Sequence, residues 1–191
     1  MSRWFTSVKH LKALSHISHG DMSKRSLPIF ESNLVRLRLL DESDLPMTRR
    51  WRNQDSIRKW FLNTGIISEE QHLAWFARYH EQDDDFVFII EKKENENRPV
   101  GQVSIYQIDW SNYRAEYGRI MIGEADARGK GLAKAATRLV LEVAFGALGL
   151  KVVALEVRSD NLPALAVYRD CGFEVTGQGD SLIYMSAVRP T

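Results

Sequence analysis

The residues with the clearest chemical potential form a basic loop punctuated by glycine, Arg128-Gly129-Lys130-Gly131-Leu132-Ala133. The loop follows the run Arg119-Ile120-Met121-Ile122 and opens a long amphipathic segment that reaches Leu148. Glycine lets a backbone come close to a ligand, and the free N–H groups at a helix start favour an anion. Neighbouring basic side chains, including Lys134, add positive charge. The loop predicts a phosphate-bearing ligand; the alternative is a helix start that is merely solvated.

Hydrophobic periodicity and capping signals indicate the elements that position this loop. Alternating leucines and arginines predict a strand that begins at Leu34, and Pro46 belongs to the first turn of a helix that runs to about Trp51. Ser68 and Gln71 have the spacing of a capping box, so a second helix is expected over 69–81. Further strands are predicted at Phe86–Glu91, Val100–Asp109, Glu116–Ile122 and Lys151–Val157, further helices from Leu132 to Leu148 and from Leu162 to Cys171, and a final hairpin at Phe173–Val175 and Leu182–Met185.

Composition limits the class of protein. The chain of 191 residues, with 44% hydrophobic and 27% charged residues, is typical of one soluble globular domain. A net charge of +1 gives no reason to expect nucleic acid or an anionic membrane as a partner. The single cysteine, Cys171, excludes an internal disulfide framework and a cysteine-rich zinc site, and it fits a reducing cytoplasm. No segment approaches the ~20 apolar residues that span a bilayer.

Residues 1–33 differ in character from the rest of the chain. Apolar residues recur there at roughly helical spacing, and no acidic residue precedes Asp21. A weakly ordered extension, an amphipathic helix and a targeting or membrane-surface segment all fit this pattern, and the extension is favoured. We therefore divide the chain into an N-terminal extension, 1–33, and one domain, 34–191.

A second motif lies downstream of the loop, where Asn161, Ala164, Tyr168 and the pair Gly172-Phe173 follow one another. Together with Arg128, Gly131 and Ala133, these residues resemble the two sequence patterns of the GNAT superfamily of acyl-CoA-dependent N-acetyltransferases. The resemblance covers residues 34–186, and its specific part runs from Glu116 to Phe173. It implies an α/β (α+β) fold with a mixed, mostly antiparallel central sheet flanked by helices, in which the strands at Glu116–Ile122 and Lys151–Val157 splay apart.

The resemblance also implies acetyl-CoA as co-substrate and no metal. Its pyrophosphate would lie on the loop and its pantetheine arm would pair with the backbone of the central strand. Backbone N–H groups near Met121 and Ile122 would hold the developing oxyanion. The expected cofactor-binding residues are Ile120, Met121, Ile122, Arg128, Gly129, Lys130, Gly131, Leu132, Ala133, Asn161 and Tyr168. Asn161 also fits a helix-capping role.

The implied chemistry is direct attack of an amine on the thioester. Tyr168 is the expected general acid, because a phenol is protonated at pH 7 and can donate to the leaving thiolate; alternatively its ring belongs to the core. Glu116 is the expected general base. Arg114 and Arg119 lie close enough in sequence to make Glu116 part of an ordinary surface ion pair instead.

The acceptor is expected to lie against the segment from Trp51 to Ser68. Its sequence looks like the branch of the family that acetylates nucleotide-linked amino sugars, because aromatic rings can stack on a base or a sugar and arginines can pair with a diphosphate. The expected substrate-binding residues are Trp51, Arg52, Asn53, Arg58 and Trp60. The alternative places the aromatic rings in the core and the arginines on a solvated face.

Two other functions stay open. The segment Tyr113-Arg114-Ala115-Glu116-Tyr117 resembles polyamine and ribosomal-protein N-terminal acetyltransferases, although the ending that those relatives usually carry, with an Asn-Gly turn, is missing. The chain would otherwise be a non-catalytic acyl-CoA sensor or an interaction module. The expected partners are a small-molecule amine and a second copy of the chain in a homodimer.

Overall fold

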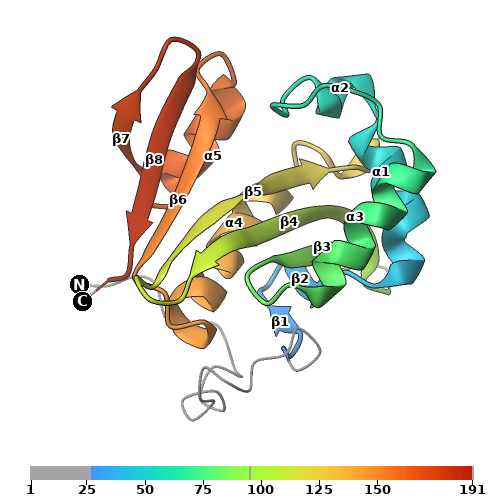
Figure 1. Cartoon of the computed structure of the whole chain (residues 1–191), viewed down its shortest axis with the longest axis horizontal. Coiled ribbons are helices and arrows are strands. Elements are labelled where there is room, and N and C mark those ends of the chain that lie inside the picture. The colour runs from blue at the N-terminus through green and yellow to red at the C-terminus, as the bar shows by residue number, and fades with distance from the viewer. Residues whose placement is uncertain (1–26, 95, 191) are drawn as a thin grey trace.

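The computed structural model describes residues 27–94 and 96–190. Eight strands form one sheet: β1 Phe30–Glu31, β2 Val35–Leu39, β3 Phe86–Lys92, β4 Arg98–Asp109, β5 Arg114–Ile122, β6 Val152–Arg158, β7 Glu174–Gln178 and β8 Leu182–Val188. Five α-helices accompany it: α1 Leu45–Arg52, α2 Asp55–Arg58, α3 Glu69–Glu81, α4 Leu132–Glu142 and α5 Leu162–Asp170. Figure 1 shows their arrangement.

Most predicted elements are confirmed, with three differences. Regular structure begins earlier than Leu34, because β1 pairs with β2 through the buried Phe30. The helix α2 was not expected; like β1, it is too short to show a hydrophobic period. The helix predicted to reach Leu148 is α-helical only to Glu142 and continues as the π-helical segment η5, Val143–Ala147. The rest of the predicted extension, residues 1–26, lies outside the described residues.

The local signals for helix ends act as expected. Ser68 accepts a hydrogen bond from the Gln71 backbone, and the Gln71 side chain accepts one from the Ser68 backbone, so the capping box starts α3. Gly172 follows α5 with φ of 87°, the left-handed conformation that commonly ends a helix. The capping box therefore fixes the start of α3, and Gly172 marks the end of α5.

The sheet has the strand order β1-β2-β3-β4-β5-β6-β8-β7. Every neighbouring pair is antiparallel except β5 and β6, which are parallel. A parallel pair needs a crossover connection, and α4 supplies it between these two strands. The mixed, mostly antiparallel sheet flanked by helices is therefore confirmed.

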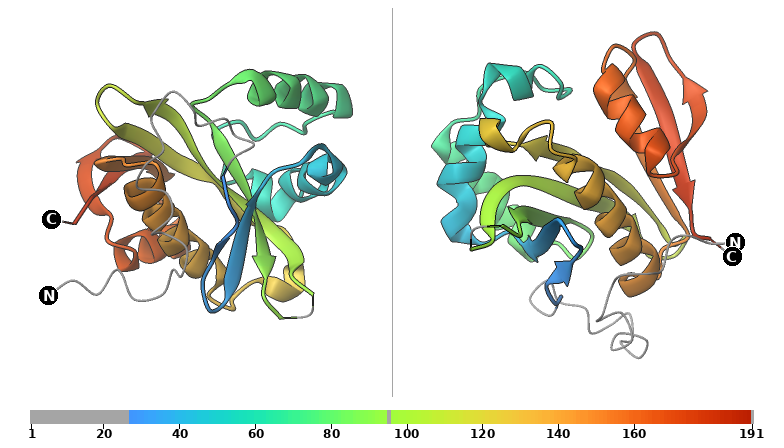
Figure 2. Two further views of the ribbon diagram at one scale, coloured as in Figure 1. Left: turned by 90° about the horizontal axis from the view of Figure 1, so that it is seen from below. Right: turned by 180° about the vertical axis from the view of Figure 1, so that it is seen from behind.

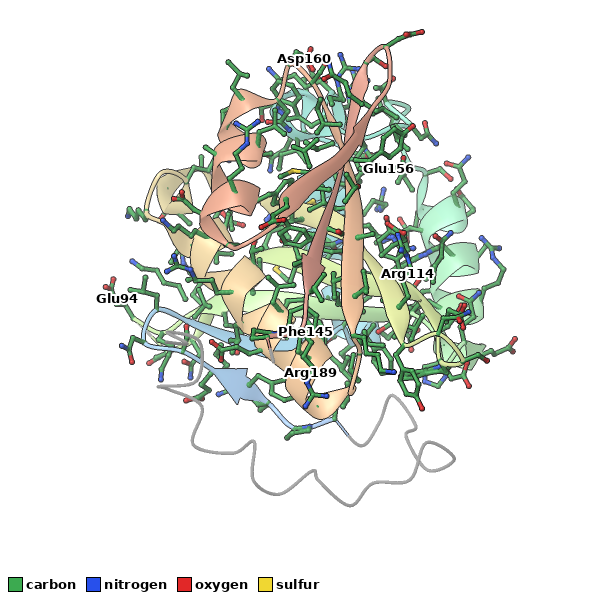
Figure 3. All side chains as sticks on the ribbon, turned by 90° about the vertical axis from the view of Figure 1, so that its left-hand side faces the viewer. Glu94, Arg114, Phe145, Glu156, Asp160 and Arg189 are labelled. Carbon is green, nitrogen blue, oxygen red and sulfur yellow. The ribbon has the colours of Figure 1, made fainter. Side chains whose placement is uncertain are left out.

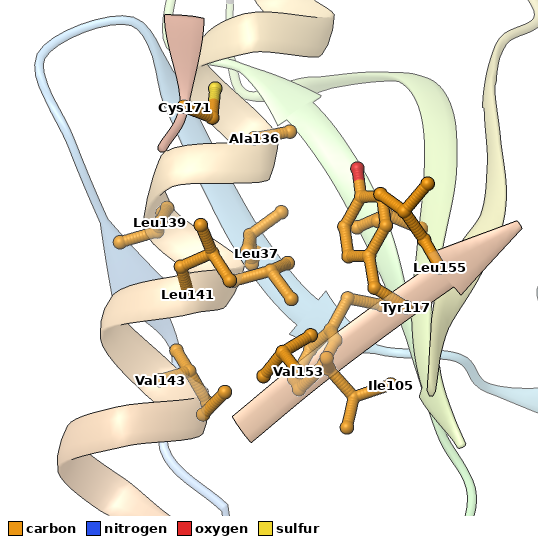
Figure 4. Packing of buried hydrophobic residues seen from close by; sticks show 14 of the residues in the cluster. Leu37, Ile105, Tyr117, Ala136, Leu139, Leu141, Val143, Val153, Leu155 and Cys171 are labelled. Carbon is orange, nitrogen blue, oxygen red and sulfur yellow. The ribbon is translucent and has the colours of Figure 1, made fainter. Parts of the chain in front are cut away.

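Helices cover both faces of the sheet. Figure 2 shows α4 and α5 on one face and α1 and α3 on the other. The larger core lies beneath α4, where its buried stripe meets apolar side chains of the strands (Figure 4): Leu37, Ile105, Tyr117, Ala136, Leu139, Leu141, Val143, Val153 and Leu155. A smaller core beneath α3 contains Tyr79, Val87 and Ile89.

The two central strands part after a short paired stretch. Arg114–Glu116 pair with Val152–Ala154, and beyond these residues β5 and β6 no longer hydrogen-bond to each other. Figure 1 shows the strands side by side at one end and apart at the other. The expected splay is confirmed, and it leaves one edge of each strand open.

Close packing of β4 on β5 supports this open edge and gives a first testable prediction. A Cβ atom at Gly101 of β4 would lie 2.1 Å from the Met121 carbonyl oxygen of β5. Because that neighbour is backbone, we expect Gly101→Ala to lower the free energy of unfolding by about 3 kcal/mol and the melting temperature by about 6 to 12 °C in a thermal unfolding experiment. At Gly177 the nearest atom to an added Cβ is 3.5 Å away, so Gly177→Ala is the matched control. Equal melting temperatures for the two variants would contradict this account.

Candidate active site

A cleft with a volume of about 740 Å³ opens where β5 and β6 part. One wall consists of β5 from Glu116 to Ile122, and another consists of Glu156–Arg158 on β6 with Asn161 at the start of α5. The segment between α1 and α3 closes one end through Ser56, Ile57 and residues 60–63. The cleft therefore lies between the splayed strands and the expected acceptor segment, and it reaches the loop at Arg128.

The glycine loop presents free backbone donors. Gly129 and Gly131 have φ of 71° and 75°, which glycine adopts without strain. In the part of the chain that the structure describes, the first N–H of this region to donate a backbone hydrogen bond is that of Ala135, so the N–H groups of residues 129–134 have no backbone partner. Gly131 caps α4 without a side-chain hydrogen bond. This row of donors at a helix start, which includes Leu132 and Ala133, fits a pyrophosphate.

The basic side chains near the loop have different tasks. Arg128 donates to the Ile122 carbonyl at 3.0 Å and to the Gln54 side chain, so it ties the loop to β5 and to α2. Lys134 pairs with Asp170 of α5. Lys130 is exposed and makes no ion pair among the described residues. Of the three charges, Lys130 is the one that is available to a ligand.

The open edge of β5 fits an extended arm. Beyond Glu116, the edge of β5 that faces β6 has no strand partner, and Ile120, Met121 and Ile122 line the cleft there. Asn161 lines the opposite side and caps α5 by accepting a hydrogen bond from the Ala164 N–H at 3.3 Å. The capping alternative for Asn161 is therefore confirmed, and its amide NH₂ makes no hydrogen bond within residues 27–94 and 96–190.

Tyr168 lies at the inner end of the cleft. Its ring packs edge-on against Tyr117 and Phe173, and the residue is 7% exposed. The Tyr117 hydroxyl bonds to Thr137 at 2.7 Å, whereas the Tyr168 hydroxyl has no hydrogen bond to any described residue. Burial raises the pKa of Tyr168 well above the usual tyrosine range. The phenol is therefore protonated at neutral pH and free to donate.

Glu116 is the last residue of β5 that pairs with β6, and it faces the cleft half-buried. Arg119 does not pair with it, because Arg119 binds Asp85 instead. Burial raises the pKa of Glu116, the charge of Arg114 lowers it, and the negative charge of Glu156 raises it further. Glu156 is exposed on β6, where Figure 3 labels it.

The coupling of these two carboxylates leads to a prediction about pH dependence. Because the charge of Glu156 raises the pKa of Glu116, Glu156→Gln should lower that pKa. If Glu116 acts as the base, the acidic limb of the kcat/KM profile should move to lower pH in this variant. Glu174→Gln removes an exposed carboxylate of β7 and serves as the control. An acidic limb that stays in place in Glu156→Gln would argue against Glu116 as the titrating base.

The structure separates the expected acceptor residues into two groups. Arg52 and Trp60 line the cleft. Trp51 does not, because its ring is fully buried and its indole N–H donates to Glu124 at 2.7 Å. Asn53 exchanges two hydrogen bonds with the Ile67 backbone, and Arg58 binds Asp55 and the Thr64 carbonyl. Trp51 is therefore a core residue, as the alternative interpretation held. Asn53 and Arg58 stabilise the fold of the segment between α1 and α3.

Among the cleft residues that sequence reasoning missed, Tyr106 and Glu156 lie beside Glu116 in the strand register. Tyr106 on β4 stands opposite Glu116 on β5. On β6, Glu116 pairs with Ala154, and Glu156 lies two positions further along the same strand. Strand alternation places all three on one face. That signal becomes usable only once the strand register is known.

Other candidate chemistry finds no support among the described residues. Cys171 is buried, and burial raises the pKa of its thiol to about 11, which disfavours the reactive thiolate. Residues 27–94 and 96–190 contain no group of three His, Cys, Asp or Glu side chains that could hold a metal ion. No helix in these ranges is long and apolar enough to cross a membrane.

Known proteins are similar to this chain in sequence and in fold. Residues 35–174 match the family model described as an acetyltransferase (GNAT) domain. Spermidine N(1)-acetyltransferase of Escherichia coli K12 is 30% identical over 145 residues, which cover 75% of each chain. An N-acetyltransferase 9-like protein of Caenorhabditis briggsae is 27% identical over 133 residues, 65% of this chain and 67% of that protein.

The structural comparison agrees on the fold. The crystal structure of spermidine N-acetyltransferase from Vibrio cholerae, in complex with CoA and spermine, has a TM-score of 0.73 at 22% identity, covering 83% of this chain and 97% of the other. The cleft and the free N–H groups of the loop are features that suit binding of an acyl-CoA, as the family match requires. The chain belongs to the acetyltransferase (GNAT) domain family and is an N-acetyltransferase that uses acetyl-CoA as its co-substrate.

Proposed function

We propose that the acceptor is a primary amine on an anionic small molecule, and that a nucleotide-linked amino sugar fits best. The observation that carries this proposal is the guanidinium of Arg52. It lines the cleft, yet Arg52 is only 9% exposed and its Nη1 is a buried nitrogen without a hydrogen-bond partner in the described chain. A buried donor without a partner is costly, so it favours a ligand that brings an acceptor oxygen or a negative charge.

The surroundings of Arg52 support the same ligand. Its guanidinium lies 4.1 Å above the ring of Phe61, and its other nitrogen donates to the Asn63 carbonyl, which fixes the direction of the group. Burial lowers the pKa of Arg52, and the charge of Arg58 lowers it further. An anion next to Arg52 would relieve both effects. Trp60 lines the same end of the cleft and offers an aromatic surface for a base or a sugar.

We assign the catalytic roles to residues that line the cleft between β5 and β6 or lie beside it. Glu116 removes a proton from the acceptor amine, directly or through water, and the raised pKa of its carboxyl makes it a stronger base than an ordinary glutamate. Backbone N–H groups near Met121 and Ile122 stabilise the oxyanion, and Tyr168 protonates the leaving thiolate. The N–H groups of residues 129–133 hold the pyrophosphate, and Asn161 contacts the same cofactor from α5. Acetyl-CoA supplies the activated acetyl group.

A polyamine is the second candidate acceptor, favoured by a different observation. Glu116 and Glu156 both line the cleft, and neither forms a salt bridge with any described residue. Two free carboxylates suit a substrate with more than one ammonium group. The relatives from Escherichia coli and Vibrio cholerae are named for spermidine. The positive charge of Arg52, which has no ion-pair partner among the described residues, lies in the same cleft and would repel a polycation.

The variant Arg52→Met separates the two acceptors. Methionine retains the packing on Phe61 but removes the charge-assisted hydrogen bond, which is worth about 1.5–3 kcal/mol. We expect KM for a UDP-linked amino sugar to rise about 10- to 100-fold in assays of thiol release from acetyl-CoA, with KM for spermidine unchanged or lower. Arg49→Met changes an arginine of the same helix that pairs with Glu69 outside the cleft, and it should leave both values within about twofold. Turnover of spermidine but not of amino sugars by the unmodified protein would replace the first candidate with the second.

A further inference from the structure

A bulge distorts β5 at the point where the cleft begins. Gln102 of β4 faces Met121, whereas Ser104 faces Gly118, so two residues of β5, Arg119 and Ile120, stand opposite one residue of β4. Arg119 has φ of 51°, in the left-handed region that is costly for any residue other than glycine. Strain of this kind persists only where surrounding contacts hold it. The cause should therefore lie in what Arg119 touches.

The side chain of Arg119 is clamped by a buried carboxylate. Its Nη1 donates to both oxygens of Asp85, at 2.9 and 2.7 Å, and the Asp85 side chain is 7% exposed. Asp85 directly precedes β3, and β4 lies between β3 and β5 in the sheet. The ion pair thus ties the bulge of β5 to a strand that is not its neighbour.

The clamp passes over Tyr106 of β4. The guanidinium carbon of Arg119 lies 4.2 Å from the centre of the Tyr106 ring. A Cβ atom at position 118 would come within 3.0 Å of the Tyr106 hydroxyl, so Gly118 leaves the room that this hydroxyl needs. Tyr106 also faces Glu116 across the strand pair and lines the cleft. Arg119 therefore fixes the backbone of β5 and the Tyr106 ring at once.

We propose that Arg119, held by Asp85, is a positioning residue for acetyl transfer. It keeps the bulge in the conformation that turns the N–H groups of β5 toward the thioester, and it holds the Tyr106 hydroxyl beside Glu116 on the acceptor side. The proposal rests on the acetyltransferase activity and not on which amine is the acceptor.

The first test is Asp85→Asn in the full chain, which keeps the shape of the side chain and removes the charge that holds Arg119. We expect kcat to fall about 10- to 100-fold, while KM for acetyl-CoA changes by less than about threefold, because the loop at 129–133 is untouched. Asp44→Asn is the matched control. Asp44 is also bound through both oxygens by an arginine, Arg38, and its side chain is similarly buried at 6% exposed, but neither residue lines the cleft. The Asp44→Asn variant should have a lower melting temperature than the unmodified protein and an unchanged kcat.

Substitutions of Arg119 separate positioning from simple stabilisation. Arg119→Lys retains a charge that reaches Asp85 and should recover part of the kcat lost in Arg119→Ala. Arg119→Gly should melt at a higher temperature than Arg119→Ala, because glycine relieves the backbone strain, yet kcat should stay as low. Wild-type kcat in Asp85→Asn or in Arg119→Gly would overturn the proposal.

The assays use spermidine and a UDP-linked 4-amino sugar, so that failure of the proposed acceptor is distinguishable from failure of the clamp. If neither amine is acetylated, the proposed acceptors are wrong, but amide hydrogen exchange still tests the clamp. Asp85→Asn should speed exchange at residues 119–122 at least about tenfold relative to Asp44→Asn. Equal exchange in the two variants would overturn the clamp whatever the acceptor.

Discussion

Replacing Tyr168 by phenylalanine is expected to lower kcat by about 100- to 1,000-fold, because we propose its phenol as the proton donor to the leaving thiolate. The hydroxyl has no hydrogen bond to a described residue, so its removal leaves no partner unsatisfied, and the free energy of unfolding should change by less than about 0.5 kcal/mol. Single-turnover measurements of thiol release, with acetyl-CoA binding followed by calorimetry, separate the chemical step from binding. Acetyl-CoA affinity should stay within about twofold.

Tyr117→Phe is the control for the hydroxyl of Tyr168. The two rings are 5.8 Å apart, but the Tyr117 hydroxyl is bonded to Thr137. Its loss should cost about 1 kcal/mol of stability and leave kcat within about threefold. Since burial raises the pKa of Tyr168, no basic limb of the pH profile should come from this residue near neutral pH. Unchanged kcat in Tyr168→Phe would remove Tyr168 from the mechanism.

The second large effect concerns the glycine loop. In Gly131→Ala we expect acetyl-CoA affinity to fall about 100-fold, because the added methyl group strains the left-handed backbone at φ of 75° and keeps the pyrophosphate away from the N–H groups of the α4 start. No atom lies within 4 Å of the added Cβ, so the fold itself should accommodate the change. Isothermal titration with CoA measures the affinity directly.

Gly149 provides a control with the same backbone strain. It has φ of 67° and an added Cβ also meets nothing within 4 Å, but it lies between η5 and β6, at the far end of the α4–η5 helix from the loop. Gly131→Ala and Gly149→Ala should therefore lose similar stability, about 1–2 kcal/mol each, and differ only in CoA affinity. A similar loss of affinity in both would mean that strain, and not the approach of the phosphate, explains the result.

Much of the fold was predictable because its signals are local. The capping box at Ser68, Pro46 in α1 and the buried stripe of α4 each depend on residues a few positions apart. The loop at 128–133 was predictable for the same reason. The ion pair of Asp85 with Arg119 was not, because 34 positions separate its members and only the order of β3, β4 and β5 brings them together.

The acceptor wall was harder to predict because aromatic and basic residues serve both packing and binding. Trp51 and Trp60 are nine positions apart in similar surroundings, yet one is fully buried against Gly123 and the other lines the cleft. Trp51 lies in the last turn of α1 and Trp60 follows the four-residue helix α2, so no single hydrophobic period spans both residues. The expected homodimer and the role of residues 1–33 stay predictions.

The short pairing of β5 with β6 has a consequence for how the molecule opens and closes. Across this seam Arg114–Glu116 pair with Val152–Ala154, and the Tyr113 carbonyl accepts hydrogen bonds from the Lys151 and Val152 N–H groups, whereas β6 pairs with β8 along its whole length. The seam is therefore where the native state should come apart first, into a unit of β1–β5 and a unit of β6–β8. A ligand that contacts both sides of the seam, with its arm on β5 and with Asn161 from the β6–β8 side against it, would stabilise the joined state by mass action. Acetyl-CoA bound in this way would make the two units unfold together, so we expect it to raise the cooperativity of unfolding as well as to serve as substrate.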